Sequence, residues 1–188
     1  MRKCVRKGFW VWNFDKEEKW LNEMAAKGLA LVSVGFCRYE FEDCTPGEYA
    51  IRMEYCEKRP RSVEGQKYLS FIEDTGAEHV GTYGKWVYLR KKTADGGFEL
   101  FSDNTSRIDH LTRIIRLVAG LTILNLVVGL FNLALLGISI FVQHQPAPLS
   151  TGNGIGFVNV ILSILGFIGW ARLVAKRKRL RRETQIFE

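Results

Sequence analysis

Two uncharged apolar runs in the C-terminal half of the chain constrain its fold more than any other feature. Residues 117–142 contain no charged side chain, and a second apolar run extends from Ile155 to Ala171. At about 1.5 Å per residue the first run makes a helix of roughly 39 Å, longer than the roughly 30 Å hydrocarbon core of a bilayer. The sequence therefore predicts two transmembrane helices, at 117–142 and 152–174, joined by an extracytoplasmic loop at 143–151.

Basic residues beside these runs predict the topology. The net charge of +7 arises within residues 105–188, because residues 1–104 carry equal numbers of basic and acidic side chains. Lys and Arg accumulate on the cytoplasmic side of membrane spans. We therefore expect a multi-pass protein of the cell membrane with both termini in the cytoplasm, ending in a basic tail at 175–188. The orienting residues are Arg113, Arg116, Arg172, Lys176, Arg177, Lys178 and Arg179.

The position of the charge also bears on partners. Because the basic excess flanks the apolar runs, it fits contact with the lipid bilayer, including anionic headgroups, better than a groove for nucleic acid. Neither apolar run, 117–142 or 155–171, contains an ionisable residue, which argues against a transport pathway.

Small and polar residues form a stripe on each predicted span. An amide side chain is costly in hydrocarbon unless it finds a partner, so such stripes predict contact between helices. The contact is expected within the hairpin, or through self-association or a protein partner. The residues are Asn125, Gly129 and Asn132 on the first span, and Asn159, Ser163 and Gly166 on the second.

The first 104 residues change repeatedly between helical and strand periodicity. A first helix is expected to start with a capping box formed by Asp15 and Glu18 and to end at Gly28. The predicted helices are 16–27 and 64–75, and the predicted strands are 4–14, 29–34, 36–42, 49–55, 80–91 and 98–101.

This order of elements predicts an α+β fold. We expect an N-terminal antiparallel sheet with two helices on one face, forming a cytosolic domain over residues 1–104. An amphipathic neck helix at 105–116 should then lead into the two-helix transmembrane hairpin.

The domain offers few residues for metal or cofactor chemistry. Cys4, Cys37, Cys44 and Cys56 form no C-x-x-C pair and have no histidine at metal-ligand spacing. We expect reduced thiols, no metal and no cofactor.

Catalysis is also not expected. His79 is the only histidine of the domain, and no nucleophile and base occur at a suggestive spacing. A deep pocket that collected Glu78, His79 and a cysteine would favour an enzyme instead. The candidates for ligand binding are Trp10, Trp12 and Trp86, although core packing is the more common role of such rings.

Several motifs together resemble domain-of-unknown-function family 2812, a bacterial, membrane-associated family. They are Phe14-Asp15-Lys16-Glu17-Glu18-Lys19-Trp20-Leu21-Asn22-Glu23-Met24-Ala25, then Gly28, Pro46-Gly47-Glu48-Tyr49, Glu99-Leu100-Phe101-Ser102-Asp103-Asn104 and Ser106-Arg107-Ile108. The resemblance covers most of residues 5–116. It implies C-terminal membrane spans and, because such proteins are often encoded near PadR-like transcriptional regulators, a regulatory context. It brings no catalytic residue.

These observations predict a membrane-anchored, non-enzymatic accessory or regulatory protein whose cytosolic domain binds a ligand or a protein. One alternative is a small subunit of a membrane complex, such as a transporter partner or a toxin-neutralising protein. The other is a membrane-bound enzyme.

Overall fold

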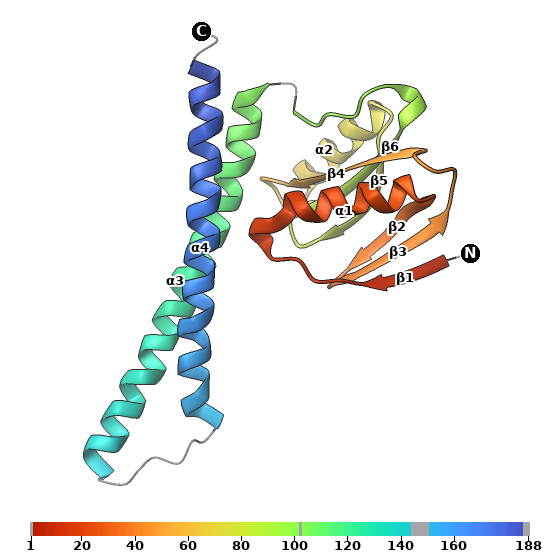
Figure 1. Ribbon diagram of the computed structural model, residues 1–188. Coiled ribbons are helices and arrows are strands. Elements are labelled where there is room, and N and C mark those ends of the chain that lie inside the picture. The colour runs from red at the N-terminus through yellow and green to blue at the C-terminus, as the bar shows by residue number, and fades with distance from the viewer. Residues whose placement is uncertain (1, 102, 144–150, 186–188) are drawn as a thin grey trace. The chain divides into compact units, whose positions relative to one another are not determined.

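The computed structural model describes residues 2–101, 103–143 and 151–185, in two compact units that meet between Arg113 and Ile114. The expected α+β fold followed by a helical hairpin is confirmed (Figure 1). The elements are β1 (Arg2–Arg6), a 3-10 turn (Val11–Asn13), α1 (Phe14–Ala26), β2 (Leu29–Gly35), β3 (Arg38–Asp43), β4 (Tyr49–Tyr55), α2 (Val63–Asp74), β5 (Glu78–Tyr83), β6 (Trp86–Lys92), a second 3-10 turn (Thr93–Asp95), α3 (Asn104–Gln143) and α4 (Thr151–Gln185).

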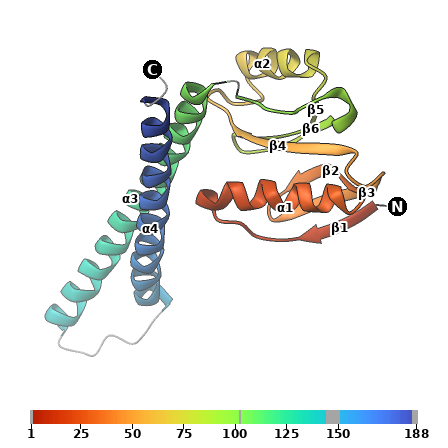
Figure 2. The same ribbon diagram turned by 45° about the horizontal axis from the view of Figure 1, so that its top comes forward.

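The strands form two three-stranded antiparallel sheets, which we call the first sheet (β1-β3-β2) and the second sheet (β4-β6-β5). Helix α1 lies between them, because its buried Leu21 packs in one core with Phe41 of the first sheet and Ile51 of the second. Helix α2 covers the other face of the second sheet, where its Leu69 packs with Leu89. Figure 2 accordingly shows α2 on one side of the second sheet, and α1 with the first sheet on the other.

This layering corrects the predicted arrangement of one sheet with both helices on one face. Each helix covers its own sheet, and the second sheet is buried on both sides. Along β6, Tyr88 belongs to the core around α1, whereas Val87 and Leu89 belong to the core around α2. A strand buried on both faces loses the alternation of polar and apolar residues from which a one-sided sheet is recognised.

The first unit, Met1–Arg113, contains two repeats, β1-α1-β2-β3 and β4-α2-β5-β6. Both sheets place their strands in the same order, first, third, second. Each helix is followed by a glycine with positive φ, Gly28 at 82° and Gly76 at 85°. The second strand of each repeat then has a bulge at the same place, between Leu31 and Ser33 in β2 and between His79 and Gly81 in β5. The number of residues from the glycine to the bulge is identical in the two repeats. The strand order, the glycine and the bulge of one repeat therefore each have a counterpart in the other.

The two sheets meet where β2 approaches β5. A Cβ atom on Gly81 would lie 2.9 Å from Cγ2 of Val34, so only glycine permits this approach. Arg90 of β6 reaches across and donates a 3.0 Å hydrogen bond to the carbonyl of Leu31, while its Nε atom pairs with Glu78 at 2.7 Å. The contact fixes the second sheet against the edge of the first.

Three predicted elements are wrong in detail. The expected strand 80–91 is a hairpin, because Gly84 adopts a φ of 63° in the turn between β5 and β6. In place of the expected strand 4–14, β1 ends at Arg6, and the 3-10 turn follows after residues 7–10. Residues 98–101 form no strand. Phe98 is nevertheless buried in the core around α2.

In the second unit, α3 and α4 are both long and apolar enough to cross a membrane. Within this unit they approach each other at glycines. A Cβ atom on Gly129 would lie 3.0 Å from Cγ2 of Val160 and 3.2 Å from Cβ of Asn159, and one on Gly166 would collide with the side chain of Thr122. The predicted loop, 143–151, falls mostly outside the described residues.

Candidate functional site

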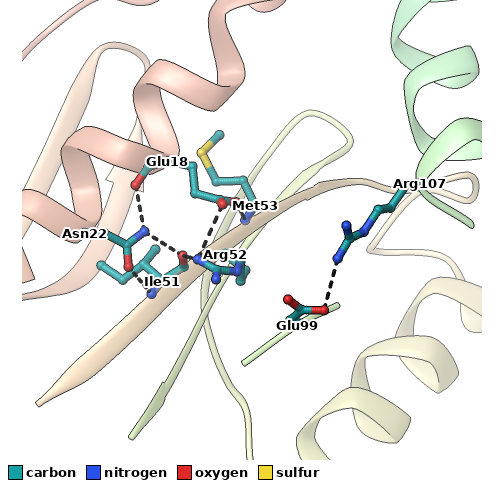
Figure 3. Close-up of polar contacts among 7 residues, drawn as sticks. All are labelled: Glu18, Asn22, Ile51, Arg52, Met53, Glu99 and Arg107. Carbon is teal, nitrogen blue, oxygen red and sulfur yellow. Dashed lines mark hydrogen bonds and ion pairs between the residues drawn. The ribbon is translucent and has the colours of Figure 1, made fainter. Parts of the chain in front are cut away.

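The outer edge of β4 is closed by side chains rather than by a neighbouring strand. Asn22 of α1 accepts a 2.9 Å hydrogen bond from the amide of Ile51 and donates a 2.8 Å bond to the carbonyl of the same residue. One helical turn earlier, a carboxylate oxygen of Glu18 accepts a 2.8 Å bond from the amide of Met53 (Figure 3). The other carboxylate oxygen of Glu18 lies 3.5 Å from the guanidinium of Arg52. Residues one turn apart on α1 thus satisfy alternate residues of an edge strand.

His110 of α3 continues the same series. Its Nε2 atom accepts a 2.9 Å hydrogen bond from the amide of Tyr55, the next outward-facing donor of β4. For Nε2 to accept, the ring proton must sit on Nδ1. The ring is 5% exposed and lies among Phe14, Trp86 and Phe101. The first turns of α3 are therefore packed as part of the first unit.

Beside His110, a buried carboxylate holds a second residue of α3. Glu54 is 2% exposed. One of its oxygens accepts a 2.6 Å bond from the hydroxyl of Tyr68, and the other lies 3.6 Å from the guanidinium of Arg113. Burial raises the pKa of Glu54, and the bond from Tyr68 and the charge of Arg113 oppose that rise. The Nε atom of Arg113 is buried and has no hydrogen-bond partner. Glu54, Tyr68 and Arg113, which we call the Glu54 group, therefore join β4, α2 and α3.

A second buried carboxylate lies in the core around α1. One oxygen of Glu17 accepts hydrogen bonds from the hydroxyls of Tyr39 at 2.7 Å and Tyr88 at 2.6 Å. Burial raises the pKa of Glu17, and both tyrosine bonds oppose that rise. Because Tyr39 belongs to the first sheet and Tyr88 to the second, Glu17 fixes α1 to both.

The tryptophans proposed for ligand binding are divided between two places. Trp10 and Trp12 stack on each other at 4.9 Å between ring centroids, and Trp10 is 51% exposed. Trp86 instead packs against Phe14 and Tyr55. Two hollows in the described part of the chain have lining residues that include none of the three tryptophans.

Both hollows border α2. One of about 300 Å³ is lined by Pro60, Arg61, Gln66, Leu69, His79 and Thr82. It contains neither Glu78 nor a cysteine, and His79 is bonded to the hydroxyl of Thr82 at 2.8 Å. Within the described ranges, no cluster of three or more His, Cys, Asp or Glu could hold a metal ion. All four cysteines are unpaired, and burial raises the pKa of Cys56 to about 12.

The start of α3 is fixed by local polar contacts. A carboxylate oxygen of Asp103 accepts a 2.7 Å bond from the amide of Ser106, as an N-cap does. Arg107 pairs with Glu99 at 3.0 Å (Figure 3). Glu99 and Arg107 both belong to the motifs on which the family resemblance rests.

The comparison with protein families agrees with these motifs. The family model described as "Protein of unknown function (DUF2812)" matches residues 13–123, from the start of α1 into α3. The chain belongs to this family. No curated protein and no solved structure matches the chain. The DUF2812 match includes every residue of the β4 edge contacts and of the Glu54 group, so the first turns of α3 are part of the family domain.

Sequence reasoning missed the functions of Glu18, Asn22 and His110 in this DUF2812 domain. The sequence predicts a capping box of Asp15 and Glu18, but α1 begins at Phe14 and its N-cap, Asn13, makes no side-chain hydrogen bond. The available signal was the spacing of two polar residues, Glu18 and Asn22, one turn apart beside the buried Leu21.

The stripe residues of the spans all lie on α3 or α4. Each is buried or half-buried, and Gly129 and Asn159 are brought together directly. The side-chain amides of Asn125 and Asn132 each donate to a carbonyl of their own helix, at 2.9 and 2.7 Å. Ser163 does the same toward Asn159 at 2.8 Å.

The residues proposed to orient the chain fall in both units. Arg113 is tied to Glu54, whereas Arg116 is exposed on α3. The other orienting residues are all on α4: Arg172, Lys176, Arg177, Lys178 and Arg179.

Proposed function

We propose that the protein is a membrane-anchored accessory or regulatory protein without catalytic activity, whose cytosolic domain binds a protein or a small ligand. The observation that carries this proposal is the bonding of His110 and Arg113 to β4. Both residues precede the first apolar run on one continuous helix, α3. A domain that serves only as a tethered unit needs no such buried attachment to its anchor.

The same strand offers a route from the domain to α3. On its outer edge, β4 is bonded to Glu18 and Asn22 of α1 and to His110 of α3. A ligand that binds one arrangement of α1 and β4 more tightly than another shifts the population toward that arrangement. We propose that this shift changes the bond between Tyr55 and His110, and through it the state of α3.

An enzyme is less well supported. Each of the two buried carboxylates has tyrosine donors, and the hollow beside His79 collects neither Glu78 nor a thiol. A small subunit of a membrane complex remains the second proposal. It is less favoured because the small and polar stripes of α3 and α4 contact each other, leaving apolar side chains on their other faces.

The coupling can be tested by amide hydrogen exchange on the full-length chain in detergent. His110→Ala removes the acceptor of the Tyr55 amide, and we expect exchange at Tyr55 and Met53 to accelerate at least tenfold. Asp109→Ala, an exposed neighbour on α3, is the matched control and should leave exchange unchanged. Unaltered exchange in His110→Ala would contradict the proposed coupling.

The binding function needs a separate test. Affinity purification of the full-length chain from solubilised membranes should recover one reproducible partner or ligand with wild type and with Asp109→Ala, and less with His110→Ala. Failure to recover any from the folded wild-type chain counts against the proposal.

The proposed topology has its own test. In intact cells, an impermeant thiol reagent should label Ser150→Cys in the predicted outside loop and leave the exposed Cys4 unlabelled until the membrane is permeabilised. Labelling of Cys4 in intact cells would reverse the orientation.

A further inference from the structure

The outer face of α2 carries exposed apolar side chains. Val63 is 70% exposed and Phe71 is 65% exposed, and Lys67 lies midway between them. The three residues border a shallow hollow of about 540 Å³, together with Arg61 and Asp74. We refer to these five residues as the α2 patch.

The repeat shows that the apolar character of this face is unusual. Counting back from the glycine that ends each helix, Val63 and Phe71 of α2 correspond to Asp15 and Glu23 of α1. All four positions are exposed, but α1 fills them with carboxylates. Helix α2 is also the last layer of the stack, and terminal layers of stacked repeats ordinarily have a polar outer face. An apolar face at this position is characteristic of an interaction surface.

The charges of the α2 patch indicate which molecule binds it. Arg61 precedes the first turn of α2 and Asp74 is its last residue, with Lys67 near the midpoint. When two such helices pack antiparallel about a two-fold axis near Lys67, Val63 of one copy lies close to Phe71 of the other. The same operation brings Arg61 of each copy to Asp74 of its partner. The two Lys67 side chains carry like charges on either side of the axis, so the complementarity comes from the Arg61–Asp74 and Val63–Phe71 pairs. A patch that pairs with itself under a two-fold rotation makes an isologous contact.

We propose that the α2 patch binds the α2 patch of a second copy of this chain, in an antiparallel pair. One face of a three-turn helix buries less than the roughly 1,200 Å² expected of a stable interface. The contact therefore depends on the high effective concentration that a shared membrane gives to two anchored chains. The pairing is independent of which ligand the domain binds.

Cysteine crosslinking of the full-length chain in its membrane tests the pairing, with Cys4→Ser as the background because Cys4 is exposed. Lys67→Cys lies beside the proposed axis and should form a disulfide-linked dimer under mild oxidation. Lys19→Cys, the corresponding exposed position of α1, is the matched control and should give at least tenfold less dimer. Equal yields at the two positions would overturn the proposal.

Two further variants test the chemistry and direction of the contact. Adding Phe71→Glu to Lys67→Cys should lower the dimer yield at least fivefold, while tryptophan fluorescence shows that the chain remains folded; an unchanged yield means random collision and overturns the proposal. Coexpressed Val63→Cys and Phe71→Cys chains should crosslink to each other more than either does to itself. Preferential Val63 to Val63 crosslinking indicates a parallel pair and overturns the antiparallel one.

Discussion

Asn22 forms hydrogen bonds with both backbone groups of Ile51, so one helix side chain replaces a neighbouring strand at this point of β4. A side-chain amide offers a donor and an acceptor in one plane, as this pair of bonds requires. The contact joins the two repeats, because Asn22 lies in the first and Ile51 in the second.

Asn22→Ala should lower the free energy of unfolding by about 1–3 kcal/mol, because it leaves the Ile51 amide without a partner and removes one of the two side-chain donors to the Ile51 carbonyl, the other being Arg52. Glu23→Ala changes the adjacent exposed residue and should stay within about 0.5 kcal/mol. Denaturant unfolding of the full-length chain in detergent, followed by tryptophan fluorescence, measures both. Equal effects would show that the Asn22 bonds contribute nothing.

Arg113→Met should destabilise the first unit by about 3 kcal/mol, because it leaves the Glu54 carboxylate buried without a charge partner. Arg116→Met removes an exposed charge from the same helix and should have little effect. Glu54→Gln combined with Arg113→Met should recover part of the loss. A double variant no more stable than Arg113→Met would show that the Glu54 charge is not the cause.

The free energy of unfolding of the first unit should depend on pH through Glu17. Because burial raises the pKa of Glu17 in the folded chain, the folded state binds more protons than the unfolded state between the ordinary and the raised pKa. The stability from this group is fully present below that window and is lost as pH rises through it. Glu17→Gln removes this dependence, so its stability relative to wild type should increase as the pH rises across the window. Unfolding curves at a series of pH values will show a constant difference if this is wrong.

Packing of α3 on α4 should be sensitive to side-chain volume at one glycine and insensitive at another. Gly166→Val places atoms against Thr122 and should cost about 1–3 kcal/mol. Gly137→Val is the matched control, since a Cβ atom there meets nothing within 4 Å. Thermal unfolding in detergent, monitored by helical circular dichroism, compares the two. Comparable melting temperatures would contradict the glycine contact.

The fold class and most element positions were predictable because they depend on local periodicity and on glycine. The ends of α1 and α2 follow from Gly28 and Gly76, and the two apolar helices follow from composition alone. The layering was not predictable, since β6 is buried on both faces and its residues carry no one-sided alternation.

The candidate site was less accessible from sequence than the fold. His110 lies far along the chain from Tyr55, and nothing local marks an imidazole as the acceptor for a strand amide. The alternating pattern of β4 predicts that Glu54 faces solvent, although it is among the most buried residues of the domain. Such contacts are set by tertiary structure, which brings together residues whose own neighbourhoods give no signal.

Closure of β4 by Asn22, Glu18 and His110 also determines how copies of this chain can associate with one another. An open strand edge is a template on which identical chains add to one another without limit. If the chain is anchored in a membrane as proposed, its copies meet often, and an unprotected β4 would expose each of them to that hazard. By occupying its amides internally, the molecule removes one route to aggregation and leaves encounters between copies to side chains.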